Sequence, residues 1–149
     1  MGCKLLFVCT GNTCRSPLAE GLAKKIFDHS VTVRSAGLEA WEGSQASYQA
    51  IEVGKELGVD LTGHRAFKVT FELLKEFDWI IPMTRIQERE LQRRFPALAN
   101  RVRCLGDWND SKEDIQDPWG GSLESYRASA VQIEKLLRGV KLKLLKTGC

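Results

Sequence analysis

The chain has 149 residues, of which 43% are hydrophobic and 28% charged, a size and composition that suit one globular domain and exclude disordered, collagen-like and low-complexity proteins. Its 22 basic and 19 acidic residues leave a net charge of +3, which is too weak to indicate nucleic-acid binding. No signal peptide and no apolar stretch of about 18 residues is present, so we expect a cytoplasmic protein with neither nucleic-acid nor membrane partners.

The first elements predict a parallel strand pair. Residues 4–9 form a short apolar run ended by Thr-Gly-Asn, which is typical of a buried strand. A helix is expected next, with Ser16 as its N-cap and Pro17 at its first position. Residues 31–35 predict a second strand, so a right-handed crossover should join two parallel strands.

The rest of the chain continues the alternation of helices and strands. The expected elements are a helix over residues 44–57, a strand over 79–81, a helix from the cap Thr84 to Phe95, a weaker strand over 101–105 and a long helix over 123–145. We therefore predict one α/β domain over residues 1–149. Its four-stranded, mostly parallel sheet should be flanked by helices, with ligands bound at the loop after the first strand.

That loop, residues 9–16, reads Cys-Thr-Gly-Asn-Thr-Cys-Arg-Ser. Gly11 and Asn12 readily adopt positive φ, so the chain can curl until its N–H groups point inward and bind an anion. A helix N-terminus favours the same anion, and Arg15 can grip two phosphoryl oxygens at once. The sequence therefore predicts a phosphate cradle, formed by Thr10, Gly11, Asn12, Thr13, Cys14 and Arg15.

The same electrostatic field acts on Cys9, the first residue of the loop. A helix N-terminus and a cation can lower a thiol pKa from about 8.5 to about 3.5–7.5, so Cys9 is expected to be a thiolate nucleophile. The five cysteines, at positions 3, 9, 14, 104 and 149, are odd in number and irregularly spaced. This pattern favours reduced thiols over a disulfide framework.

Attack by a thiolate requires a proton donor for the leaving group. The polar segment 107–117 offers four aspartates and Glu113, so composition alone does not choose among them. Asp117 is favoured because Pro118 fixes the backbone directly after it.

The segment Val-Cys-Thr-Gly-Asn-Thr-Cys-Arg-Ser-Pro at residues 8–17 resembles the low-molecular-weight protein tyrosine phosphatase family, and the resemblance spans the chain. Ser-Ala-Gly at 35–37, His-Arg-Ala at 64–66, Met-Thr at 83–84 and Asp-Pro-Trp-Gly at 117–120 follow in the family's order. It implies a phosphatase without metal or cofactor that forms a cysteinyl phosphate, with Cys9, Arg15 and Asp117 as its catalytic residues.

The resemblance also implies supporting roles. Ser16 should hydrogen-bond the Cys9 sulfur, and Asn12 and Ser35 should hold the shape of the loop. Cys14 lies within the same curled loop, so a reversible disulfide with Cys9 is a candidate redox switch.

Thr13 and the Asp-Pro-Trp-Gly-Gly segment bear on the substrate. The bacterial protein-arginine phosphatases resemble this chain in carrying threonine and a compact loop there, whereas tyrosine-directed members usually carry isoleucine or leucine. We therefore favour phosphoarginine in a protein substrate over phosphotyrosine, with Thr13, Trp119 and Trp41 determining specificity.

We expect a monomer or weak dimer. Two other functions remain open. An arsenate reductase of similar scaffold needs a relay of further cysteines, but no cysteine lies between Cys14 and Cys104. A phosphoprotein-binding module would use the cradle without the chemistry.

Overall fold

The computed structural model describes residues 2–149 and centres on a parallel sheet of three strands in the order β2-β1-β3. Its strands are β1 (Cys3–Cys9), β2 (Val31–Gly37) and β3 (Trp79–Pro82). Strand β1 is central, so Phe7 pairs with Ser35 on one side and with Ile81 on the other. The predicted strand, helix, strand order and the parallel sheet are confirmed.

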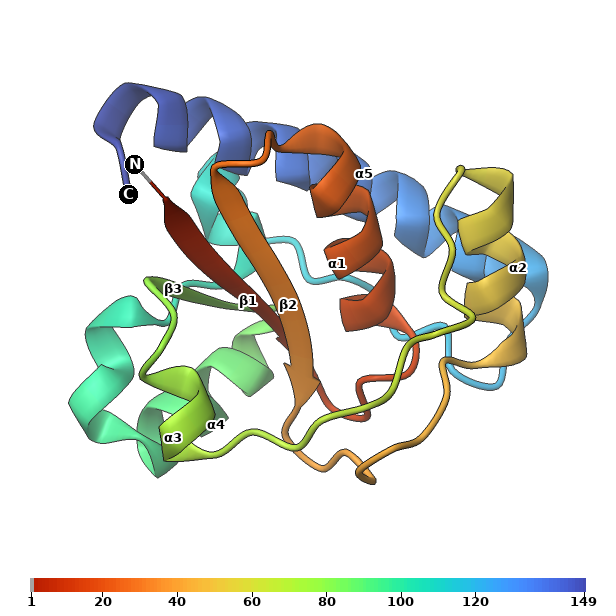
Figure 1. Cartoon of the computed structure of the whole chain (residues 1–149), viewed down its shortest axis with the longest axis horizontal. Helices are drawn as coiled ribbons and strands as arrows, with labels where there is room; N and C mark the ends of the chain where they lie inside the picture. Colours follow the sequence, from red (N-terminus) through yellow and green to blue (C-terminus); the bar gives the residue numbers. More distant parts are fainter. Residues whose placement is uncertain (1) are drawn as a thin grey trace.

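Helices cover both faces of the sheet (Figure 1). The helices are α1 (Arg15–Ile26), α2 (Tyr48–Glu56), α3 (Phe71–Leu74), α4 (Arg85–Arg94) and α5 (Leu123–Thr147), with 3-10 turns η1 (Pro96–Arg101) and η2 (Leu105–Asn109). Leu5 and Phe7 of β1 pack into the core beneath α1 and α5. Leu6 and Val8 point to the opposite face and pack with residues of α3 and α4. Successive residues of β1 therefore pack alternately into two hydrophobic cores, one on each face of the sheet.

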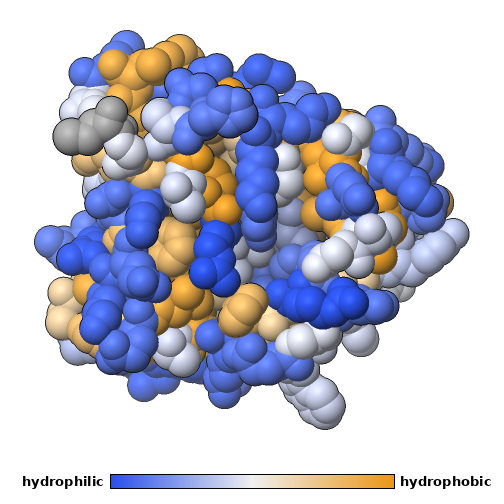
Figure 2. Space-filling model, viewed as in Figure 1, coloured by the Kyte–Doolittle hydropathy of each residue, from blue (hydrophilic) through white to orange (hydrophobic). Residues whose placement is uncertain are grey.

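Hydrophilic side chains cover most of the face seen in Figure 2, with apolar side chains visible between them. None of the helices within residues 2–149 combines the length and the apolar character that spanning a bilayer requires.

The fourth predicted strand, over residues 101–105, is reduced to a bridge. Val102 pairs with Ile80 in parallel, and the Arg103 N–H donates to the Ile80 carbonyl at 3.0 Å. Turn η1 ends at Arg101 and η2 begins at Leu105. The two turns leave too few extended residues between them for a strand.

The starts of the helices were predicted with mixed success. Thr84 caps α4 as predicted, and Gln87 completes a capping box with it. The prediction that Ser16 caps the first helix is wrong, because Cys14 occupies that position and Ser16 lies in the first turn. The Ser16 hydroxyl contacts the Cys9 sulfur instead, at 3.0 Å.

The expectation of reduced thiols rather than disulfides is wrong for two of the five cysteines. Cys3 at the start of β1 and Cys149 after α5 form a disulfide, and the start of β1 and the C-terminal end of the chain lie close together in Figure 1. Sequence spacing could not reveal this pair. The two cysteines are 146 residues apart in the sequence, and only the folded chain brings them together. The free thiols are Cys9, Cys14 and Cys104.

We expect Cys149→Ser to lower thermal stability, because the disulfide closes a loop of nearly the whole chain and restricts the unfolded state. A loss of about 2–4 kcal/mol would lower Tm by roughly 5–15 °C. Calorimetry of the oxidised wild type, the reduced wild type and the variant measures the effect. The variant and the reduced wild type should melt together, and equal Tm values for all three would contradict the prediction.

Candidate active site

The loop between β1 and α1 borders a pocket of about 320 Å³ at the carboxyl end of the sheet. The pocket is lined by Cys9, Thr10, Gly11, Thr13, Cys14, Arg15, Asp117 and Trp119. A larger pocket of about 380 Å³, bordered by α1 and residues 58–64, contains none of the loop residues. The predicted catalytic trio therefore shares one cavity.

Asn12 braces the loop from behind and is fully buried. Its φ of 57° lies in the left-handed region, whereas Gly11 does not use positive φ. The Asn12 amide donates to Ser16 Oγ at 2.8 Å and to Ser35 Oγ at 2.9 Å, and its oxygen accepts from the Phe67 N–H. These bonds hold a backbone conformation that most residues avoid.

The end of β2 supports the same loop through a close approach of backbone at Gly37. A Cβ at this position would lie 2.6 Å from the Thr10 carbonyl oxygen and 2.9 Å from the Asn12 nitrogen. Only glycine allows the loop to pack this closely against β2.

The Cys9 sulfur lies inside the curl of the loop. It accepts a hydrogen bond from the Asn12 N–H at 3.3 Å and lies 3.0 Å from Ser16 Oγ. Cys9 is 3% exposed, and helix α1 begins at Arg15, so the helix N-terminus faces the same region. The Asn12 N–H and the N-terminus of α1 therefore both point partial positive charge toward this part of the loop.

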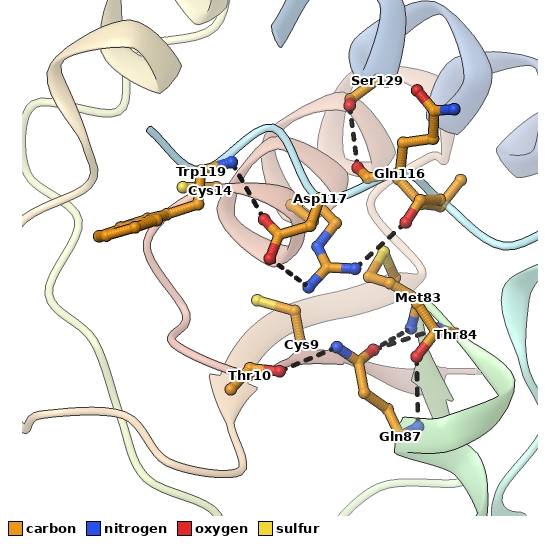
Figure 3. A network of polar contacts seen from close by, with 12 residues as sticks. Cys9, Thr10, Cys14, Met83, Thr84, Gln87, Gln116, Asp117, Trp119 and Ser129 are labelled. Atoms are coloured by element: carbon orange, nitrogen blue, oxygen red, sulfur yellow. Dashed lines mark hydrogen bonds and ion pairs between the residues drawn. The ribbon is translucent and has the colours of Figure 1, made fainter. Parts of the chain in front are cut away.

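Arg15 is 5% exposed and connects the cradle to the segment that carries Asp117. Its guanidinium donates to the Ile115 carbonyl at 3.1 Å and forms an ion pair with Asp117 at 3.5 Å. The Asp117 side chain is 56% exposed and accepts a hydrogen bond from the Trp119 N–H. Asp117 thus borders the pocket, and Figure 3 shows its carboxylate on the side of the pocket where Trp119 also lies, above Cys9.

Gln87 contacts the cradle although sequence analysis did not identify it. Its side-chain NH₂ donates to Thr10 Oγ1 at 3.2 Å, and its oxygen accepts from the Met83 and Thr84 N–H groups (Figure 3). The capping-box pattern at Thr84 was the available signal. It indicates the helix cap but not a contact 77 residues away.

Cys14 is buried against α5 and α2. Its sulfur lies 3.2 Å from Tyr126 Oη and 3.6 Å from Ser47 Oγ. Burial and the contact with Cys14 raise the pKa of Tyr126 to about 12. The redox role of Cys14 stays a prediction.

The two tryptophans assigned to specificity lie differently. Trp119 is 75% exposed and borders the pocket, whereas Trp41, 83% exposed, is not among the lining residues.

Ser35 and His64 lie behind the loop rather than in the pocket. Ser35 donates to Glu20 at 2.6 Å, and a ring nitrogen of His64 lies 2.7 Å from the Asn12 carbonyl oxygen.

One group of three potential metal ligands, Cys3, Asp78 and Cys149, gathers within residues 2–149. Its two sulfurs are bonded to each other, and Cys3 lies at the opposite end of β1 from Cys9. The pocket itself brings together the Cys9 sulfur, the Arg15 guanidinium and the Asp117 carboxylate. That set can support attack on a bound oxyanion with proton transfer.

The comparisons with known proteins agree with this geometry. The family model described as low molecular weight phosphotyrosine protein phosphatase matches residues 4–148. The protein-arginine-phosphatase of Bacillus subtilis (strain 168) is 36% identical over 146 residues, covering 95% of this chain and 97% of the relative. The low molecular weight protein-tyrosine-phosphatase Wzb of Salmonella typhi is 36% identical over 135 residues, covering 91% and 89%.

Among solved structures, a YwlE arginine phosphatase mutant with a phosphorylated active-site serine superposes with a TM-score of 0.92 at 34% identity. The match covers 97% of each chain.

Proposed function

Because the chain belongs to the low-molecular-weight phosphotyrosine protein phosphatase family, we propose that it dephosphorylates protein side chains through a cysteinyl-phosphate intermediate on Cys9. The observation that supports the proposal is that polar groups converge on the Cys9 sulfur in a pocket that Arg15 and Asp117 also border. The Asn12 N–H donates to Cys9 Sγ, Ser16 Oγ lies within hydrogen-bond distance of it, and Arg15 borders the same pocket.

The first chemical step transfers the phosphoryl group to sulfur. Cys9 attacks phosphorus, forming the S–P bond while the bond to the leaving oxygen or nitrogen breaks and its electron pair departs with the leaving group. Asp117 donates a proton to that atom, and Arg15 and the loop N–H groups stabilise the phosphoryl oxygens.

The second step reverses the proton transfer. Asp117, now ionised, takes a proton from a water molecule, whose oxygen forms a bond to phosphorus as the S–P bond breaks. Ser16 stabilises the departing sulfur through the 3.0 Å contact. The products are inorganic phosphate and the regenerated Cys9 thiolate.

Hydrolysis of p-nitrophenyl phosphate distinguishes this enzyme from a phosphoprotein-binding module. We expect the wild type to hydrolyse p-nitrophenyl phosphate and also to bind inorganic phosphate. A chain that binds phosphopeptides but releases no nitrophenol under any condition would instead support the binding module.

Phosphoarginine is the substrate that we favour, with phosphotyrosine second. Thr13 and Trp119 border the same pocket, and Thr13 Oγ1 can hydrogen-bond a polar guanidinium group, whereas an aliphatic residue there would pack an aromatic ring. Similar relatives include both arginine and tyrosine phosphatases. The choice between the two substrates therefore rests on the residues of the pocket.

Thr13→Ile should shift specificity toward phosphotyrosine. The hydroxyl is replaced by apolar surface, so the ratio of kcat/KM for phosphoarginine to that for phosphotyrosine peptides should fall about tenfold. Steady-state kinetics with matched peptides measures the ratio, and Thr32→Ile on the exposed side of β2 is the control. A ratio that is unchanged in Thr13→Ile would contradict the assignment.

The arsenate reductase alternative finds no support in the remaining cysteines. Burial raises the pKa of the Cys104 thiol to about 11, and Cys3 and Cys149 are joined far from the pocket. We propose that one catalytic domain, as a monomer or weak dimer, acts on phosphorylated proteins in the cytoplasm. Reducing conditions there keep the Cys9 thiol active, and they would also reduce the Cys3–Cys149 disulfide.

A further inference from the structure

The segment that carries Asp117 runs from residue 110 to residue 122, between η2 and α5, and is called the acid loop here. The Asp117 carboxylate is more than half exposed and contacts only the Trp119 N–H and Arg15 among the contacts described. A general acid must be held close to the atom that it protonates, and the Asp117 side chain has few contacts of its own to hold it. The position of Asp117 therefore depends on how the acid loop is anchored.

Two consecutive backbone groups before Asp117 are tied to different elements. The Ile115 carbonyl accepts from Arg15, and the Ile115 N–H donates to the Met83 carbonyl at 3.0 Å. The next carbonyl, that of Gln116, accepts a hydrogen bond from Ser129 Oγ at 3.1 Å (Figure 3). Ser129 lies on α5 and is 2% exposed, so its hydroxyl is held in place by the packing of that helix.

The acid loop is also anchored after Asp117. Residues 118–121 form a tight turn in which the Gly121 N–H donates to the Pro118 carbonyl at 2.8 Å. Gln49 of α2 then donates from its side chain to the Gly121 carbonyl at 3.2 Å. Asp117 is therefore bracketed by one tether from α5 and one from α2.

We propose that Ser129 and Gln49 are positioning residues that hold Asp117 where it can protonate the leaving group. This inference rests on the proposed phosphatase function, and Ser129 is the stronger tether because it is buried and bonds the residue adjacent to Asp117. Neither side chain borders the pocket. Both act through the backbone of the acid loop.

The expected effect depends on the leaving group. A general acid accelerates the departure of a poor leaving group far more than that of a good one, because a weakly basic phenolate leaves without a proton. Displacing a catalytic group by about 1 Å can cost on the order of 10²-fold. Ser129→Ala should therefore lower kcat/KM for phenyl phosphate about tenfold or more, and should leave 2,4-dinitrophenyl phosphate within about twofold.

The experiment measures kcat/KM for phenyl, nitrophenyl and dinitrophenyl phosphate, since this parameter reports the phosphoryl transfer to Cys9. The variants are Ser129→Ala, Gln49→Ala and Asp117→Asn, together with the double variant of Ser129→Ala and Asp117→Asn. Ser30→Ala, at an exposed position whose hydroxyl contacts Asp28, is the matched control. Gln49→Ala, at a half-buried position, decides the question if Ser129→Ala does not fold.

In the double variant, Ser129→Ala should lower kcat/KM hardly further than Asp117→Asn alone does, because no general acid remains to be positioned. An equal loss across the three leaving groups would overturn the inference. The same would follow from a loss on phenyl phosphate that persists undiminished in the Asp117→Asn background. A wild type that hydrolyses neither these three esters nor a phosphoarginine peptide would instead refute the proposed function itself, so the two failures are distinguishable.

Discussion

Cys9→Ser is expected to lower kcat by at least about 10⁴-fold while phosphate still binds. A serine hydroxyl is a much weaker nucleophile than a thiolate, because it loses its proton far less readily. The substitution changes one atom, so the N–H of Asn12 and the hydroxyl of Ser16 still find an acceptor at this position. The cradle should therefore keep its shape.

Calorimetric titration of this variant with inorganic phosphate measures the retained binding, and turnover of p-nitrophenyl phosphate measures the lost chemistry. Cys104→Ser is a matched control, since Cys104 is buried and does not border the pocket. Phosphate affinity in Cys9→Ser should stay within about tenfold of wild type. Substantial turnover in Cys9→Ser would show that another group attacks phosphorus.

Arg15→Lys should be the second most damaging substitution, with a loss of about 10²–10³-fold in kcat. Lysine keeps the positive charge but loses the planar set of donors that can bind two phosphoryl oxygens. In this protein Arg15 also donates to the Ile115 carbonyl and pairs with Asp117. A lysine ammonium cannot hold the acid loop and the phosphoryl group in the same geometry.

The measurement is steady-state kinetics with nitrophenyl and phenyl phosphate, compared with Arg89→Lys at an exposed position of α4. We expect both substrates to suffer with Arg15→Lys, because phosphoryl binding is lost for each. The Arg89 variant should match the wild type. Nearly normal kcat in Arg15→Lys would show that charge alone, without the planar donors, suffices at this position.

Sequence patterns predicted the parts of the site that are local along the chain. The apolar run of residues 4–9, the loop that follows and the helix that begins near Arg15 lie within one short segment, so spacing and turn chemistry determine their arrangement. The capping box of Thr84 and Gln87 is local for the same reason. The Ser16 error arose because its hydroxyl contacts the Cys9 sulfur and accepts from the Asn12 side chain, instead of accepting from a backbone N–H of the first turn. The helix-start pattern does not consider these partners.

Contacts between distant segments could not be predicted. The bond from Gln87 to Thr10 spans 77 residues, and the Cys3–Cys149 disulfide spans 146. Ser129 gave no signal at all, since a serine on an amphipathic helix has no local feature that indicates a bond to the Gln116 carbonyl. These contacts follow from the packing of α4 and α5 around the sheet.

The most direct test of the mechanism is to trap the phosphorylated enzyme. Asp117→Asn removes the base for the second step, so a good leaving group such as dinitrophenyl phosphate should load the enzyme faster than water unloads it. Mass spectrometry of rapidly quenched, digested protein should find one phosphoryl group on the peptide containing Cys9. A phosphoryl group on any other residue, or turnover with no phosphorylated enzyme at any time, would contradict the account.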